Sequence, residues 1–503
     1  MTIVDFNSDD QADYDNVPPG ASLLQSLRSV GYSLPTAVAD IADNSIAAHA
    51  RVIRLDFVWD GDQSCIAIID DGDGMSETEL REAMRPASRN PLEVRDASDL
   101  GRFGLGLKTA SFSQCRQLCV ISKRKGGNLA VRTWDLDYVA DRNEWRLLKV
   151  ITQSAKPYAD VISGLESGTA VVWGKLDRVV NEGTGAQDPV GQTRFHAQIE
   201  EVEQHLGLTY HKFIEAKTLR ISVNGSAVRS WNPYLDNALQ VIATPIESIE
   251  YRGTEILFQG FVLPHKDKLT NEEFERSGGP NGWNAQQGFY VYRNGRLLLC
   301  GDWLGLGSPT RWTIREEFRL ARISIEIGNT TDADWHLDVK KSTARPPAIV
   351  RPRLTHLAET VRERARSVFV HRGRYGKRAV PKEEVVRPWH VLSNGSKSRY
   401  VINRSHPLVA SAISSAGQSV EFDRLFRLLE QTIPIQQIWL DAVQETTSSA
   451  YDDVSLDVIR SDLRCIRDHL EQSGLSPQLA ISALRNIEPF MDFPKLIKEL
   501  EGE

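Results

Sequence analysis

Cysteine is scarce in this sequence, and long apolar runs are missing from it. The 503 residues include five cysteines, an odd number, and no Cys-x-x-Cys pair. Such usage is typical of a reducing compartment and argues against a zinc site. No apolar run approaches the roughly 18 residues of a membrane span, and the acidic N-terminal stretch lacks the apolar core of a signal peptide. We therefore expect a cytoplasmic protein with no membrane partner.

Positive charge is also scarce, except in one segment. The net charge is −7, yet residues 341–404 carry 16 Lys and Arg against four Glu and no Asp, a net of +12 that leaves −19 for the rest. Such a run is usually just solvated. A strongly basic segment in an acidic protein nevertheless suggests contact with phosphate backbones. The candidate DNA contacts lie in its short stretch 371–378: Arg372, Arg374, Lys377 and Arg378.

The stretch Ile66–Met75 is the most informative part of the chain. Its apolar run, residues 66–69, predicts a buried strand. A carboxylate where such a strand ends is costly without a partner, so Asp70 is either satisfied by backbone donors in a turn or directed at a ligand. Gly72 and Gly74 allow the backbone to approach something flat or phosphorylated. Taken alone, the pattern fits a plain acidic turn equally well.

A predicted helix over residues 36–50 carries three polar residues on one face. Asp40, Asp43 and Asn44 lie three and four positions apart and therefore share that face, beside an apolar stripe. A solvated helix face explains these three residues as well as a role in binding phosphate or a metal ion does. The metal would be a hard cation such as Mg²⁺, which prefers oxygen ligands.

The glycine-rich stretch 101–111 begins another helix. It nearly matches the P-loop, but Leu107 separates Gly106 from Lys108 and no buried strand precedes it, so we reject a P-loop. Glycines at the start of a helix can still donate backbone N–H groups to phosphates. The polar, irregular residues 86–100 have the character of a mobile lid.

Four motifs in this order resemble the ATP-binding boxes of the GHKL superfamily, which contains gyrase B, a heat-shock chaperone, histidine kinases, MutL and MORC ATPases. One box alone is a weak signal, whereas four in order over about 130 residues are specific. The continuation Lys108-Thr109-Ala110 is most similar to the MORC-like and MutL-like branches. The boxes are Asp40…Asp43-Asn44, Asp70-x-Gly72-x-Gly74, Gly101-x-x-Gly104-x-Gly106 and Gly168-Thr169.

The resemblance implies an α+β fold in which a helix-on-antiparallel-sheet sandwich, the Bergerat fold, holds ATP and Mg²⁺. Asp70 would take the adenine amino group with support from Thr169, and Asn44 would hold Mg²⁺ to the phosphates. Asp40 stands where the family usually has Glu, the base that orients the attacking water, so hydrolysis is expected to be slow. The remaining residues expected around the nucleotide are Asp43, Gly72, Gly74, Met75, Gly101, Gly104, Gly106, Lys108 and Thr109.

The later part of the chain resembles a transducer domain followed by helices. The stretches YRNGRLL and HLDVKKS are similar to MutL and MORC proteins, in which a lysine after the last strand reaches the ATP γ-phosphate. Lys340 and Lys341 are both candidates for this contact, and the alternative is that both are surface lysines. We expect an ATP-binding domain with an N-terminal arm (1–205), a transducer-type α/β domain (206–345), and a basic linker with a helical C-terminal domain (346–503).

The chain is thus identified as a bacterial MORC-like or MutL-like GHKL ATPase, which implies ATP-gated homodimerisation and clamping or remodelling of DNA. Family analogy alone adds a restriction or phage-defence system with nuclease or helicase partners. A chaperone of the same superfamily remains an alternative, as does a nucleotide-binding switch with little hydrolysis. A histidine kinase is disfavoured, because no histidine precedes Asp40 to serve as phosphoacceptor.

Overall fold

The computed structural model divides into two units, Met1–Arg374 and Tyr375–Glu503, and each is described by itself. The structure describes residues 28, 31–86, 106–235, 241–328, 331, 334–335, 344–370, 386–394, 397–415, 420–434 and 454–500. Several predicted features lie outside these residues: the arm at 1–20, nearly all of the lid at 86–100, Gly101, Gly104, Lys340, Lys341, and the basic residues Arg372, Arg374, Lys377 and Arg378.

A seven-stranded sheet is the scaffold of the first domain. Its strands are β1 (Val52–Val58), β2 (Cys65–Asp70), β3 (Gln117–Lys123), β4 (Leu129–Asp135), β5 (Gly168–Gly174), β6 (Arg220–Val223) and β7 (Ser226–Ala227). Their order is β4-β3-β5-β2-β1-β6-β7, and every pair is antiparallel except β1 with β6. All six residues of β2 are buried, because the strand is central and both faces of the sheet are covered.

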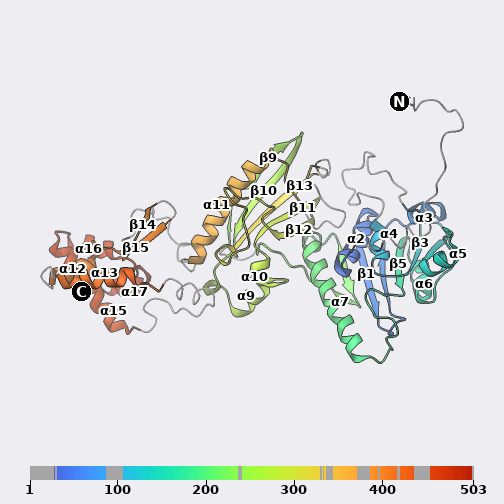
Figure 1. Cartoon of the computed structure of the whole chain (residues 1–503), viewed down its shortest axis with the longest axis horizontal. Coiled ribbons are helices and arrows are strands. Elements are labelled where there is room, and N and C mark those ends of the chain that lie inside the picture. The colour runs from blue at the N-terminus through green and yellow to red at the C-terminus, as the bar shows by residue number, and fades with distance from the viewer. Residues whose placement is uncertain are drawn as a thin grey trace, which may run out of the picture. The chain divides into compact units, whose positions relative to one another are not determined.

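Helices cover both faces of this sheet (Figure 1). They are α2 (Leu34–Ala47), α3 (Glu77–Met84), α4 (Gly106–Phe112), α5 (Leu136–Arg142), the 3₁₀ helix η2 (Gln153–Ala155), α6 (Lys156–Gly164), α7 (Pro189–Thr209) and α8 (His211–Glu215). Helices α2, α3, α4 and α7 share the larger core with one face, and α6 packs on the other. Helix α2 begins at Ser33, whose side chain accepts from the Thr36 amide, and Pro35 occupies its first turn.

The second domain is built on a six-stranded sheet. Its strands are β8 (Ile242–Ala243), β9 (Glu247–Tyr251), β10 (Thr254–Val262), β11 (Gly288–Arg293), β12 (Arg296–Asp302) and β13 (Ala321–Ile327). The order is β12-β11-β13-β10-β8, with β9 pairing β10. Asn294-Gly295, a pair typical of a tight hairpin turn, joins β11 to β12, and both residues have positive φ, as a type I′ turn requires.

A long helix, α11 (Arg351–Val370), lies on this second sheet (Figure 1). The approach is close at Gly260 of β10, where a Cβ would come within 2.2 Å of the Val361 side chain. The connection between β10 and β11 is polar and rich in glycine, yet it contains short helices. A Thr270–Glu273 capping box begins one of them. These elements and one later turn are η3 (Lys266–Lys268), α9 (Asn271–Gly278), α10 (Gly282–Ala285) and η4 (Glu316–Phe318).

The second unit is mainly helical, as predicted, and adds a hairpin that was not. Its elements are β14 (Trp389–Asn394), β15 (Lys397–Ile402), α12 (Pro407–Ser415), α13 (Val420–Gln431), α15 (Leu456–Gln472), α16 (Pro477–Leu484), η7 (Phe490–Asp492) and α17 (Pro494–Leu500). Apolar residues of α15, α16 and α17 form its core. Within the described residues of both units, no helix has the length and hydropathy needed to cross a membrane.

Two local features complete the description of the first domain. Residues 145–151 form no strand of the sheet, because this segment makes only one isolated bridge, between Leu148 and Thr133 of β4, and leaves Val150 exposed. Cys115 and Cys119 are packing residues, since both are fully buried free thiols.

Candidate functional site

Asp70 ends the central strand β2, and both of its oxygens accept hydrogen bonds. Ser45 Oγ of α2 donates to Oδ2 at 2.8 Å, and the Gly72 amide donates to Oδ1 at 3.0 Å. Burial raises the pKa of this carboxyl to about 6, although the bonds from Ser45, Gly72 and the Thr169 backbone oppose the rise. Asp70 is therefore held by local donors, as in a plain acidic turn. Its charge is still incompletely compensated, as expected of a carboxylate directed at a ligand.

Thr169 lies directly opposite Asp70 in the β2–β5 pairing. Its hydroxyl is 2.8 Å from Ser122 Oγ on β3, and Ser122 Oγ also accepts from the Met75 amide at 2.8 Å. Ser122 therefore connects Thr169 to the turn after β2. Sequence reasoning missed Ser122, although a hydroxyl inside the apolar strand 117–123 was a signal for it.

The two glycines after β2 are required by close approaches within the first domain. A Cβ on Gly72 would lie 2.7 Å from the Ala48 carbonyl oxygen and 3.0 Å from Asp70 Oδ1. Gly74 has a φ of +67°, and a Cβ there would lie 1.9 Å from the Lys123 carbonyl oxygen. Larger residues would therefore displace the turn from α2 and β3.

The three polar residues of α2 differ in their surroundings. Asn44 is exposed, whereas Asp40 is 7% and Asp43 only 2% exposed. Tyr32 Oη donates to Asp40 Oδ2 at 2.9 Å. Asp43 Oδ1 accepts from Tyr210 Oη at 2.7 Å and from Arg296 Nε at 3.1 Å. A solvated face therefore does not explain the two aspartates.

Helix α4 begins beside the acidic pair. A Cβ on Gly106 would lie 3.9 Å from Asp40 Oδ2, so the start of α4 faces that carboxylate. Lys108 is buried and its Nζ donates to the Ala83 carbonyl oxygen at 2.8 Å, which attaches α4 to the end of α3. Thr109 is also buried.

The described residues fit a bound ATP with Mg²⁺. Asp70 supplies a buried acceptor, and the exposed Asn44 carries a carboxamide oxygen one residue from Asp43. No group of three or more His, Cys, Asp or Glu within the described part of the chain could hold a metal ion. Mg²⁺ commonly takes only one or two protein ligands and completes its shell with phosphates and water. Asn44 would suffice as that protein ligand.

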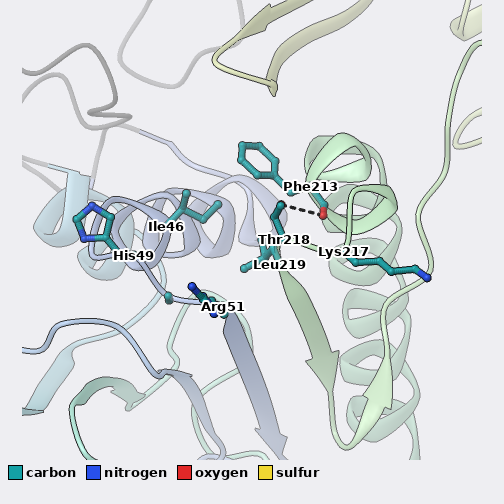
Figure 2. Close-up of a pocket in the computed structure, with 8 residues that line it drawn as sticks. Ile46, His49, Arg51, Phe213, Lys217, Thr218 and Leu219 are labelled. Carbon is teal, nitrogen blue, oxygen red and sulfur yellow. Dashed lines mark hydrogen bonds between the residues drawn. The ribbon is translucent and has the colours of Figure 1, made fainter.

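A separate open pocket of about 600 Å³ lies at the C-terminal end of α2. Figure 2 shows Ile46 and His49 on one side and Phe213, whose carbonyl accepts from Thr218 Oγ1, on the other. None of its eight lining residues belongs to the predicted site: Ile46, His49, Ala50, Arg51, Phe213, Lys217, Thr218 and Leu219.

Comparison with known proteins identifies the first domain. Residues 32–169 match the family described as Histidine kinase-, DNA gyrase B-, and HSP90-like ATPase. The ATPase morc-1 of Caenorhabditis elegans is 27% identical over 122 residues, which cover 24% of this chain and 14% of that protein. The DNA mismatch repair protein MutL of Coxiella burnetii (strain Dugway 5J108-111) is 32% identical over 103 residues, 20% of this chain and 18% of that protein. The chain thus spans less than a fifth of the length of these relatives.

Proposed function

Because residues 32–169 form a GHKL ATPase domain similar to those of MORC and MutL proteins, we propose that the chain is an ATP-gated, dimerising ATPase that clamps or remodels DNA. The observation that carries the nucleotide part is Asp70. Its carboxylate is buried at the end of a central strand, next to Thr169, with a pKa raised to about 6. A site that desolvates a carboxylate in this way is typical of ligand recognition.

In this proposal residues of α2, β2 and β5 divide the work on ATP. Asp70 accepts the hydrogen bond of the adenine amino group, and Ser45, Gly72 and Ser122 hold Asp70 and Thr169 in place. Bound Mg²⁺ would neutralise phosphate charge, with Asn44 as its protein ligand. Asp40, oriented by Tyr32, accepts the proton of the attacking water.

The DNA part of the proposal is supported by charge and by the relatives. The segment 341–404 has a net charge of +12 in a chain of net −7. One relative carries mismatch repair of DNA in its name. The basic residues predicted to contact phosphates lie outside the described residues, so this assignment stays a prediction from the sequence, as does a place in a restriction or phage-defence system.

ATP turnover with and without duplex DNA tests the proposal. We expect DNA to raise the turnover rate, and Asp70→Asn to abolish turnover in both conditions. Neutralising the basic cluster should weaken DNA binding and reduce the salt slope by up to about four units, since each phosphate contact contributes about 0.9. The cluster variant replaces Arg372, Arg374, Lys377 and Arg378 with Gln.

A control variant replaces four exposed basic residues of the first domain with Gln: Lys125, Arg142, Arg146 and Lys149. This control should keep the parental affinity and salt slope. Equal slopes for parent and cluster variant would contradict DNA contact by the cluster. Turnover that responds to unfolded protein and not to DNA would favour the chaperone alternative.

One observation favours a nucleotide-binding switch with little hydrolysis as a second candidate. Asp40 replaces the usual Glu, is one methylene shorter, and lies 4.0 Å from the guanidinium of Arg296. ATP binding without measurable turnover, in the presence and absence of DNA, would support the switch and contradict the ATPase.

A further inference from the structure

Arg296 belongs to the second sheet, yet its guanidinium lies against the acidic residues of α2 in the first domain. Nε donates to Asp43 Oδ1 at 3.1 Å, and Nη2 is 4.0 Å from Asp40 Oδ1. The side chains of Arg296 and Asp43 are 5% and 2% exposed. We propose that Arg296 is a positioning residue through which the second domain sets the orientation of α2 and thereby the rate of ATP hydrolysis. The proposal rests on the proposed ATPase function.

Three elements meet at the Asp43 carboxylate. Asp43 comes from α2, Arg296 from the start of β12, and Tyr210 from the residue that ends α7. Tyr210 Oη is 2.7 Å from both Asp43 Oδ1 and the Ala39 carbonyl oxygen. Because Asp43 is buried, these two donors compensate its charge in place of water. Removing one partner of a buried pair is costly, since the other charge is left uncompensated.

The hairpin that carries Arg296 is itself fixed to both domains. The Gly295 amide donates to Glu326 Oε1 of β13 at 2.9 Å. The other oxygen, Glu326 Oε2, accepts from Lys212 Nζ of α8 at 2.9 Å. His211 of α8 lies 2.9 Å from the Tyr292 hydroxyl of β11. Movement of the second sheet relative to α7 and α8 must therefore also move Arg296 or break these bonds.

A displacement of Arg296 reaches the reacting groups through α2. Asp40 and Asn44, the proposed base and Mg²⁺ ligand, lie on this same helix, on either side of Asp43 in the chain. When Arg296 moves, α2 must follow, or the buried Asp43 carboxylate loses the cation that lies against it. A misplacement of about 1 Å at a catalytic group can slow turnover on the order of 10²-fold. Asp70 lies on β2 and keeps the hydrogen bond from the Gly72 amide, so recognition of adenine should be less affected than hydrolysis, although Ser45 of α2 also contacts Asp70.

Arg296→Gln tests the coupling, with Arg296→Lys as the conservative variant. Arg252→Gln is the matched control, because it breaks an ion pair of the second domain, with Asp334, that involves neither α2 nor the hairpin of Arg296. We expect Arg296→Gln to bind ATP within about threefold of the parent, while kcat falls at least about tenfold. Amide exchange of residues 34–47 should be faster without nucleotide in this variant only, and Arg296→Lys should recover part of kcat.

The double variant Arg296→Gln with Asp43→Asn tests whether the single variant merely fails to fold. It replaces both charged partners with neutral ones, so neither partner is left as a buried charge without its counter-charge. Its defect should be smaller than the sum of the two single defects. Parental kcat and parental exchange in Arg296→Gln would overturn the proposal. If the parent protein does not turn over ATP, the proposed ATPase function fails. Amide exchange of α2 then still decides whether Arg296 sets the orientation of this helix. Faster exchange in Arg296→Gln than in parent and Arg252→Gln supports the coupling, and equal exchange in all three overturns it.

Discussion

Protonation of Asp70 should link ATP binding to pH near neutrality. Burial raises its pKa to about 6, and the proposed contact with the adenine amino group needs the ionised carboxylate as acceptor. We therefore expect a constant affinity above pH 7 and an affinity about tenfold weaker at pH 5, one unit below the pKa. The affinity for adenosine is measured as a control. The phosphates of ATP change their ionisation in this pH range, whereas adenosine has no phosphate and does not.

The same burial makes Asp70 a cost to the stability of the first domain. The native pKa of about 6 exceeds the ordinary value of 3.8, so the native state binds more protons than the unfolded chain between these two values. The free energy of unfolding contributed by this group therefore falls as pH rises through that window and stays low above it. Two pKa units correspond to about 3 kcal/mol.

Asp70→Asn removes this cost and keeps the local hydrogen bonds. The amide oxygen can still accept from Gly72, and the amide nitrogen can donate to the Ser45 hydroxyl, which then acts as acceptor. At pH 8 we expect the free energy of unfolding to rise by about 3 kcal/mol, which raises the melting temperature of a domain this size by roughly 6–12 °C. The same variant should lose ATP binding, because the amide offers the wrong hydrogen-bonding pattern to adenine.

Calorimetric titration and thermal unfolding at pH 5 and pH 8 check both effects. Asp73→Asn is the control, since Asp73 is an exposed carboxylate of the same turn; it should change neither affinity nor melting temperature. The reasoning is refuted if parental ATP affinity is equal at the two pH values. It is also refuted if Asp70→Asn is less stable than the parent at pH 8.

Two further predictions concern hydrolysis and dimerisation. Asp40→Ala should bind ATP and hydrolyse it at least ~10²-fold more slowly, the usual scale for a lost base; steady-state turnover at the parental rate would make Asp40 a bystander. Replacing Lys340 and Lys341 together with Ala should leave ATP binding intact and remove an ATP-induced shift to a closed dimer, because ATP and ADP differ in the γ-phosphate that such a lysine would contact. Light scattering of the parent protein and of this variant, with ATP and with ADP, measures the shift as a change in molar mass. A molar mass of the parent protein that ATP leaves unchanged would contradict the ATP-gated clamp.

Local patterns in the sequence were sufficient for the elements that surround the site. The apolar run before Asp70 predicted a buried strand, and Asn294-Gly295 predicted the hairpin, because each signal depends on neighbouring residues. The helices α9 and α10 were missed because they are short and polar, without apolar periodicity. The capping box at Thr270 and Glu273 was the one local sign of α9.

The surroundings of the acidic residues of α2 could not be predicted in the same way. Asp43 is 167 residues from Tyr210 and 253 residues from Arg296. No local pattern encodes such a pairing, since it depends on how α7 and the second sheet pack against α2. Ser122 was missed for a related reason: its contact with Thr169 follows from the register of β3 and β5, which the sequence alone does not specify.

The parallel pairing of β1 with β6 has a consequence for synthesis of the chain. Ile53 pairs with Ile221, and the Phe57 amide donates to Asn224 Oδ1, so one edge of β1 has no partner until residues 220–224 have been made. At about 5–20 residues per second, translation of the intervening chain takes on the order of 10–30 s. Throughout that interval the nascent protein presents an open strand edge, the kind of surface on which chains aggregate. The nucleotide domain thus reaches its final sheet only as the ribosome is already adding the second domain.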